Sequence, residues 1–142
     1  MKFNKLIPEL SVSDFDKSRE FYTEILGFKI VYAREEDKFA FLGFEGSQIM
    51  IEQMNGNWNT GRLEHPFGRG INLQIEVKSI EKIMASLKKN RYPIFHGPED
   101  NWYRKGDVLL GNREFLVKDP DGYLLRFTED IGKKRIKREK KN

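Results

Sequence analysis

Residues 10–28, LSVSDFDKSREFYTEILGF, contain the signals that decide the fold of this chain. Apolar residues lead into Ser13 and Asp14, and either side chain can accept a hydrogen bond from the free amides of a first helical turn. Apolar positions then recur with the spacing of one helix face, at Phe15, Phe21, Tyr22, Ile25 and Leu26, with Ser18 among them. Gly27 suits the left-handed conformation that ends a helix. The stretch predicts a strand, followed by a helix that packs on a sheet.

The rest of the first half predicts three short strands. They cover residues 28–34, 38–44 and 48–54, with turns at Asp37 and at Glu45-Gly46. After them the apolar pattern ends in a segment rich in Asn and Gly, which contains Trp58 and His65-Pro66. We interpret residues 57–69 as a connector between two halves.

The second half repeats the order of the first. Residues 71–77 alternate strictly between apolar and polar side chains, which is a strong strand signal. Ser79 can begin a helix whose apolar stripe is Ile80, Ile83, Met84 and Leu87. An extended run at Ile94-Phe95, a loop that contains Pro98 and Trp102, and strands at 108–110, 113–118 and 123–128 are expected next. Asp119-Pro120-Asp121-Gly122 suits the tight turn before the last strand.

Composition excludes several classes of protein. The 142 residues include no Cys, so disulfides, thiolate metal sites and a cysteine nucleophile are excluded. No apolar run approaches the roughly 20 residues of a membrane span, and the start has no export signal. A cytoplasmic protein without membrane contact is expected.

The basic charge is concentrated at the end of the chain. Residues 133–142 hold seven Lys or Arg and one Glu, a net charge of +6, so residues 1–132 carry −2 of the total of +4. Such a polar segment buries too little apolar surface to offset its ordering entropy. We expect residues 132–142 to be a disordered tail, and we favour a solvated end over a nucleic-acid-binding arm.

Two groups of motifs make the chain resemble the vicinal oxygen chelate superfamily, which includes glyoxalase I, extradiol dioxygenases, fosfomycin-resistance enzymes and bleomycin-resistance proteins. Residues 11–14 (SVSD), 18–22 (SREFY) and 26–28 (LGF) are similar to its first module. Residues 112–115 (NREF) and 119–127 (DPDGYLLRF) are similar to the end of its second module. The likeness covers about residues 4–130.

The resemblance implies an α+β fold of two tandem βαβββ modules that form curved mixed sheets. The whole of residues 1–131 would be one domain, with module one at about 1–56 and module two at about 70–131. Each module leaves a sheet face that needs a partner, and the resemblance implies a homodimer.

Metal-dependent members of this superfamily bind a divalent ion with four side chains, whose positions fall here on Ile7, Glu52, Asn72 and Arg126. Ile7 offers no lone pair, Asn72 offers an amide oxygen, and Arg126 is a permanent cation that would repel the ion. We therefore expect no metal, no other cofactor and no catalytic residues. The residues at these positions favour a protein that is not an enzyme. A Glu52–Arg126 ion pair is predicted in place of the metal site.

The metal-free branch that the chain resembles more closely is the bleomycin-resistance type. The chain resembles that type at Pro8, at Arg126 and at Arg113-Glu114-Phe115. The resemblance implies sequestration of a bulky aromatic or cationic compound in a dimer groove, with a bleomycin-like glycopeptide as one candidate. However, Gly111 and Asn112 stand where an aromatic residue is common in that type.

Candidate ligand-binding residues are those that the superfamily geometry would turn toward the groove, together with aromatic residues outside the periodic strands. They are Glu9, Glu52, Trp58, Asn72, Gln74, Trp102, Tyr103 and Arg126. A stacking wall and a cap over the domain edge remain open as roles for the two Trp residues. For Glu9, an exposed edge or a dimer contact is equally open.

Two other hypotheses remain. One is a metal-dependent glyoxalase-like or dioxygenase-like enzyme with a non-standard ligand set. The other is a nucleic-acid-associated module, which only the basic tail supports. His65 and His96 lie beside prolines in expected loops and away from the ligand positions, which favours loop packing over metal binding.

Overall fold

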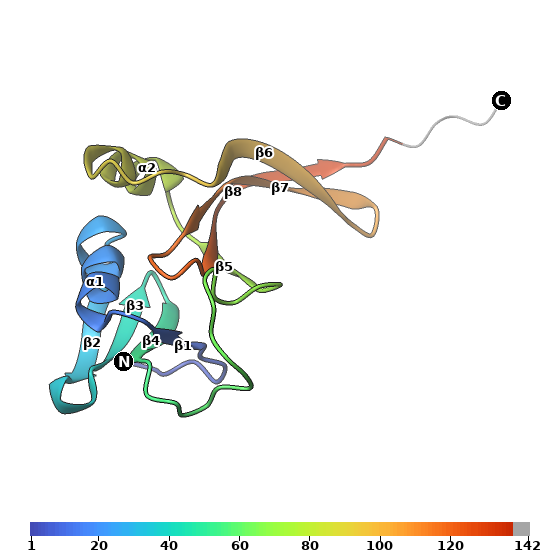
Figure 1. Ribbon diagram of the computed structural model, residues 1–142. Coiled ribbons are helices and arrows are strands. Elements are labelled where there is room, and N and C mark those ends of the chain that lie inside the picture. The colour runs from blue at the N-terminus through green and yellow to red at the C-terminus, as the bar shows by residue number, and fades with distance from the viewer. Residues whose placement is uncertain (138–142) are drawn as a thin grey trace.

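The computed structural model describes residues 1–137 and contains two four-stranded mixed sheets of identical topology (Figure 1). The first sheet has the order β1-β4-β3-β2, from β1 (Glu9–Val12), β2 (Lys29–Arg34), β3 (Phe39–Phe44) and β4 (Ser47–Gln53). The second has the order β5-β8-β7-β6, from β5 (Asn72–Glu76), β6 (His96–Lys105), β7 (Val108–Lys118) and β8 (Leu124–Arg135). In each sheet the first strand runs parallel to the last, and the other pairs are antiparallel. The expected α+β fold of two tandem βαβββ modules is confirmed.

The helix of the first module begins where the sequence predicts, at α1 (Phe15–Glu20), and Asp14 caps it by accepting from the Lys17 N–H at 3.2 Å. The chain then widens into a π-helical turn, η1 (Phe21–Ile25), in which the Leu26 N–H donates to the Phe21 carbonyl five residues back. Gly27 ends it at φ +99°, a conformation that costs glycine little. The consecutive side chains of Phe21 and Tyr22 are both buried.

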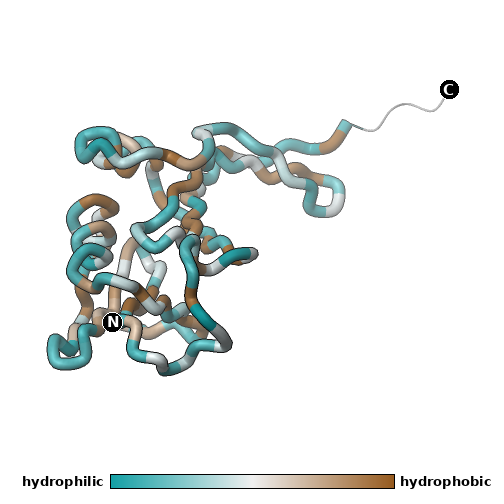
Figure 2. Tube along the Cα trace, in the orientation of Figure 1, coloured by the Kyte–Doolittle hydropathy of each residue, from teal (hydrophilic) through white to brown (hydrophobic). Residues whose placement is uncertain are grey.

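The second module places α2 (Ile80–Lys89) in the equivalent position. Ser79 precedes it without capping it, and the Glu129 carboxylate of β8 accepts from the Ile80 N–H at 3.0 Å instead. The short 3-10 turn η2 (Glu35–Asp37), which joins β2 to β3, is hydrophilic (Figure 2).

Both modules share one hydrophobic core, because the apolar residues on the inner faces of both sheets and on the helices form a single cluster. Across the helices, the rings of Phe21 and Tyr92 are 4.7 Å apart and the Ser86 hydroxyl donates to the Ile25 carbonyl at 2.5 Å. The opposite face of each sheet is turned away from this core. We call these two surfaces the open face of the first sheet and the open face of the second sheet.

A buried polar network also joins the modules. The Tyr22 hydroxyl donates to Oδ2 of Asp119 at 2.8 Å, and Oδ1 of Asp119 accepts from the Asp121 and Tyr123 N–H groups, both at 2.9 Å. Asp121 in turn accepts from the Ser13 N–H at 2.9 Å. The Asp119–Gly122 turn of the second module is thereby tied to the first strand and helix of the first module.

The second sheet is longer than the sequence indicates. Residues 98–105, expected as a loop around Pro98 and Trp102, belong to β6, and the two expected strands at 108–110 and 113–118 are one strand, β7, with a register irregularity between Gly111 and Asn112. The outer ends of β6, β7 and β8 project from the rest of the molecule (Figure 1). The polar, charged sequence of β6 lacks the alternation of a half-buried strand, and cross-strand pairing with β7 rather than burial orders it.

The expected disordered tail is also corrected. β8 continues through Arg135 because β7 offers pairing partners as far as Val108, and the Ile136 N–H donates to the Asp107 carbonyl at 3.1 Å. Residues 132–135 are therefore strand. The part of the expected tail at 138–142 lies outside the described residues.

We predict that Asp119 makes stability depend on pH. Burial raises the pKa of Asp119 from its ordinary value of 3.8 to about 6, so the folded chain binds this proton more tightly than the unfolded chain. The free energy of unfolding is therefore not reduced by Asp119 below pH 4. It falls by about 3 kcal/mol as the pH rises from 4 to above 6. Asp119→Asn should remove this loss, measured as the difference between wild-type and variant urea unfolding at pH 4, 5, 6 and 7.

The matched control is Asp16→Asn, because the Asp16 side chain is 83% exposed. Its difference from wild type should not change by more than a few tenths of a kcal/mol over the same range. Parallel stability curves for wild type and Asp119→Asn would contradict a raised pKa at this position.

We predict that Gly111 is required for the packing of Trp102 on the projecting segment. A Cβ atom at Gly111 would lie 2.6 Å from the Trp102 ring and 2.8 Å from Ile131. Gly111→Ala should therefore displace the indole, cost about 1–3 kcal/mol and shift the Trp102 emission to longer wavelength in a Trp58→Phe background. Gly61→Ala, where no atom lies within 4 Å of the new Cβ, should leave the emission unchanged. An unchanged spectrum for Gly111→Ala would show that the indole is not held there.

Candidate functional site

Two of the expected site residues, Glu9 and Glu52, lie on the open face of the first sheet. In the parallel register of β1 and β4, Ser11 pairs with Glu52 and Glu9 pairs with Met50, so the two carboxylates are close diagonal neighbours. Loss of hydration and the charge of Glu52 raise the pKa of Glu9, and the charge of Arg34 lowers it. Glu52 accepts a hydrogen bond from the Asn55 amide at 2.6 Å. The geometry thus produces a site with two adjacent negative charges.

An aromatic layer that the sequence analysis missed covers the same face. Phe39 and Phe41 are buried but lie outside the main core, beneath Tyr32. The Tyr32 and Phe41 rings stack at 5.2 Å, and Phe3 from the N-terminal segment meets Phe41 edge-on at 5.3 Å. Tyr32 is 40% and Phe3 53% exposed. The run FAFLGF at 39–44 was the available signal, because a strand that is apolar at every position has both faces covered.

The Arg34 guanidinium lies 4.0 Å from the centre of the Phe39 ring, at the edge of this layer. Asp37 accepts a hydrogen bond from its Nε at 3.1 Å. The cation nearest the aromatic layer is therefore already paired, whereas no ion pair neutralises Glu9 or Glu52 among residues 1–137.

Trp58 lies in the connector and lines a surface cavity of about 540 Å³ together with Glu9, Ser11 and Tyr123. Its side chain is 88% exposed, at a backbone φ of +62°. The indole is therefore exposed in a surface hollow that Glu9 of β1 also lines.

Gln74 and Arg126 lie side by side on the open face of the second sheet, since they are register partners on β5 and β8. Both line a cavity of about 510 Å³, together with Tyr103, Lys105, Asn112 and Lys133 among others. Asn72 is exposed at the start of β5, where it pairs with Leu124. The structure therefore brings three of the expected residues, Gln74, Tyr103 and Arg126, to one cavity.

Glu114 lies beneath this cavity and is almost completely buried, with a side chain that is 4% exposed. Its Oε1 accepts from the Asn101 amide at 2.8 Å and from the Tyr103 hydroxyl, and the hydrogen bond to Glu114 raises the pKa of Tyr103. Its Oε2 lies 3.9 Å from Nη1 of Arg126. The sequence around Glu114 gives no sign of a buried charge, because Glu114 lies between the cationic Arg113 and the apolar Phe115.

The predicted Glu52–Arg126 ion pair is wrong for the single chain. Arg126 is paired with Glu114 of the neighbouring strand, and no ion pair joins it to Glu52 in the described part of the chain. The two residues lie on the open faces of different sheets, which the shared core holds apart. The counter-ion of Arg126 is therefore Glu114 of the neighbouring strand β7.

Trp102 is separated from the other expected residues. It lies on β6 next to Tyr103, and neighbouring residues of a strand point to opposite faces. The indole packs over Gly111 and Ile131, with the Lys134 ammonium 3.8 Å from the ring centre. The expectation that Trp102 lies in a loop is corrected, and its indole is on the face opposite Tyr103 and Arg126.

The four positions that would hold a divalent ion do not fit one. Ile7 has no donor atom, Arg126 carries a permanent positive charge, and Asn72 is an exposed amide. Among residues 1–137, no three His, Cys, Asp or Glu side chains form a group suited to a metal. His96 lies 3.0 Å from Glu99 on the surface, and His65 lies in the connector.

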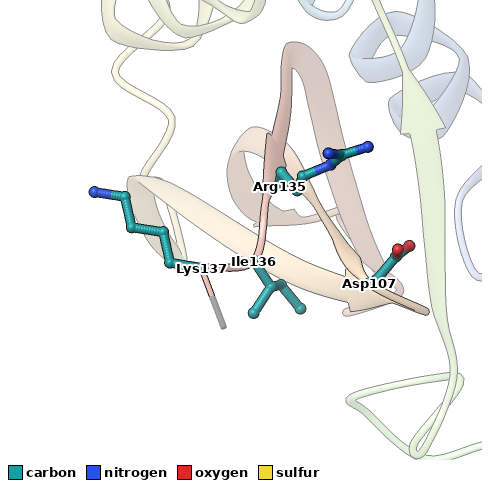
Figure 3. A pocket seen from close by; sticks show the side chains of 4 residues that line it. All are labelled: Asp107, Arg135, Ile136 and Lys137. Atoms are coloured by element: carbon teal, nitrogen blue, oxygen red, sulfur yellow. The ribbon is translucent and has the colours of Figure 1, made fainter. Parts of the chain in front are cut away.

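A further hollow lies away from the expected residues. Figure 3 shows this hollow of about 510 Å³ at the end of the projecting segment, lined by Asp107, Arg135, Ile136 and Lys137. Arg135, Ile136 and Lys137 are the last described residues, and Asp107 lies in the turn between β6 and β7. No helix within residues 1–137 has the length and apolar character that a membrane crossing requires.

Comparison with known proteins agrees with the two-module architecture. Residues 5–127 match the profile of the Glyoxalase/Bleomycin resistance protein/Dioxygenase superfamily. A lactoylglutathione lyase of Haemophilus influenzae is 27% identical over 128 residues, covering 85% of this chain and 88% of that one. A bleomycin resistance protein of Geobacillus stearothermophilus is 30% identical over 137 residues, covering 88% and 96%.

Solved structures share the fold. TioX from Micromonospora sp. ML1 is 17% identical, with a TM-score of 0.69 over 91% of this chain and 100% of the other. An integron cassette protein from the mobile metagenome of V. cholerae is 22% identical, with a TM-score of 0.65 over 91% and 97%. Relatives that include both lyases and resistance proteins do not single out one branch. With most of its length matched and both modules formed, the chain belongs to the glyoxalase/bleomycin resistance protein/dioxygenase superfamily.

Proposed function

We propose that this protein is a metal-free small-molecule binder of the bleomycin-resistance type. It sequesters a bulky aromatic, cationic compound in a groove formed by two copies of the chain. Sequestration needs no bond making, so its requirements are affinity and a preorganised surface.

The open face of the first sheet is the observation that carries this proposal. It combines two carboxylates, Glu9 and Glu52, with the exposed rings of Tyr32 and Phe3. Carboxylates attract a cation, and rings already fixed by stacking on Phe41 lose little entropy when a planar ligand packs against them. The exposed Trp58, which lines the same hollow as Glu9, offers a further ring.

A second copy of the chain would complete the groove. Within residues 1–137 the edge strands β1 and β5 each pair on one side only, and Tyr32 and Phe3 remain partly exposed on the open face of the first sheet. A two-fold pair of chains can cover both faces at once and enclose a ligand between them.

A metal-dependent lyase is the second candidate. Several relatives bear the name lactoylglutathione lyase, and Glu52 keeps a carboxylate at one metal-ligand position. The other three positions argue against it, since Arg126 would place a positive charge beside the ion. Elemental analysis separates the two: one tightly bound divalent ion per chain, together with lactoylglutathione lyase activity, would establish the lyase.

We predict that Glu9 and Glu52 supply most of the affinity for a cationic aromatic ligand. In a Trp102→Phe background, Trp58 is the only Trp, and metal-free bleomycin should quench its fluorescence. The double variant Glu9→Gln, Glu52→Gln should weaken this binding about tenfold or more, because charge-assisted contacts to both carboxylates are lost. Tyr32→Ala should weaken it by a similar factor through lost stacking.

Glu20→Gln is the matched control, because Glu20 is an exposed carboxylate of α1 far from the open face. It should bind bleomycin within twofold of wild type. Sedimentation at 20 µM should show a dimer. A monomer that neither bleomycin nor ethidium quenches would contradict the proposal.

A further inference from the structure

The guanidinium of Arg126 is incompletely hydrogen-bonded by the described residues. It carries five N–H donors, and Nε is buried without a partner. The nearest carboxylate oxygen, Oε2 of Glu114, is 3.9 Å from Nη1, which is beyond hydrogen-bonding distance. The Tyr103 hydroxyl lies near enough for Arg126 to lower its pKa, but it donates to Glu114.

The positive charge of this pair faces the cavity and the negative charge lies beneath it. Arg126 lines the cavity and its side chain is 29% exposed, whereas the Glu114 side chain is 4% exposed and its Oε2 has no contact with solvent. Asn101 and Tyr103 fix Glu114 through Oε1. A ligand that enters from solvent therefore meets the guanidinium and not the carboxylate.

The surroundings of Arg126 supply further donors. Gln74 is its register partner on β5, and Asn112, Lys105 and Lys133 line the same cavity of about 510 Å³. Glu76 and Asp130 also line the cavity, on the side where β5 ends, so the site is not uniformly basic. A planar group with two acceptor oxygens could bind the free Nη edge of Arg126 bidentately, and the amide of Gln74 is placed to assist it.

We propose that the open face of the second sheet binds a carboxylate group. Arg126 is the residue that contacts this carboxylate, and Gln74 lies beside Arg126. The carboxylate site itself does not depend on the proposed function. Only the assignment of this carboxylate to the compound held in the groove rests on that function. That compound is then zwitterionic: its cationic aromatic part faces the acidic first sheet, and its carboxylate faces Arg126. Glu114 does not touch the carboxylate; its buried negative charge lies beneath the guanidinium, 3.9 Å from Nη1.

Benzoate tests the site, with benzamide as its neutral analogue of the same shape. Titration of the full-length protein, followed through the side-chain Nε–H resonance of Arg126 by NMR, should show saturable binding of benzoate and at least about fivefold weaker binding of benzamide. Inorganic phosphate, which is anionic but not planar, should bind more weakly than benzoate. Equal affinity for benzoate and benzamide would overturn the proposal.

Variants separate binding from folding. Arg126→Gln should abolish benzoate binding, but it leaves Glu114 unpaired, so its fold is checked by circular dichroism. Arg126→Lys keeps the charge, loses the planar fork and should weaken binding about fivefold. Arg104→Gln changes the same charge on the opposite face of β6 and should leave the affinity within twofold of wild type.

Glu114→Gln gives a readout that a structural role would not produce. It removes a negative charge beneath the guanidinium while Oε1 can still accept from Asn101 and Tyr103, so benzoate should bind more tightly, by about twofold to fivefold. A folded Glu114→Gln variant that loses benzoate would overturn the proposal. If bleomycin binds as described above and benzoate does not, this inference fails while the proposed function stands. If benzoate binds and neither bleomycin nor ethidium does, the proposed function fails while the carboxylate site stands.

Discussion

The hydrogen bond from Tyr22 to Asp119 is the interaction on which the arrangement of the two modules depends. It is buried, and it joins the first helix to the turn before the last strand. A buried carboxylate that lost this donor would lose much of what offsets its desolvation, so the contact specifies one docking of the modules. Because the two inner faces then share one core, both open faces must point outward.

This arrangement gives the two open faces different chemistry. The first carries adjacent carboxylates and an aromatic layer, and the second presents a guanidinium over a buried carboxylate. The four positions that the resemblance assigns to metal ligands hold Ile7, Glu52, Asn72 and Arg126, of which only Glu52 is an anionic donor. In the single chain the two halves of that site do not meet, which is why a second copy enters the proposed function.

Much of the fold could be predicted because repeated local signals agree with one another. The cap at Asp14, the stop at Gly27 and the strict alternation of residues 71–77 gave the elements of both modules. The strand β6 was missed because HGPEDNWYRK has no apolar alternation, and pairing with β7 orders it instead. The end of β8 was missed for the same reason, since its basic residues resemble a solvated tail.

The sequence by itself determined the two βαβββ modules and the superfamily, because these depend on residue identity and local periodicity. Only the tertiary structure decided which side chains share a face. It paired Arg126 with Glu114 instead of Glu52, turned Trp102 away from Tyr103 and gathered Phe3 and Tyr32 over Phe41. Such contacts depend on strand register and on the docking of the modules, and residues far apart in the chain set both.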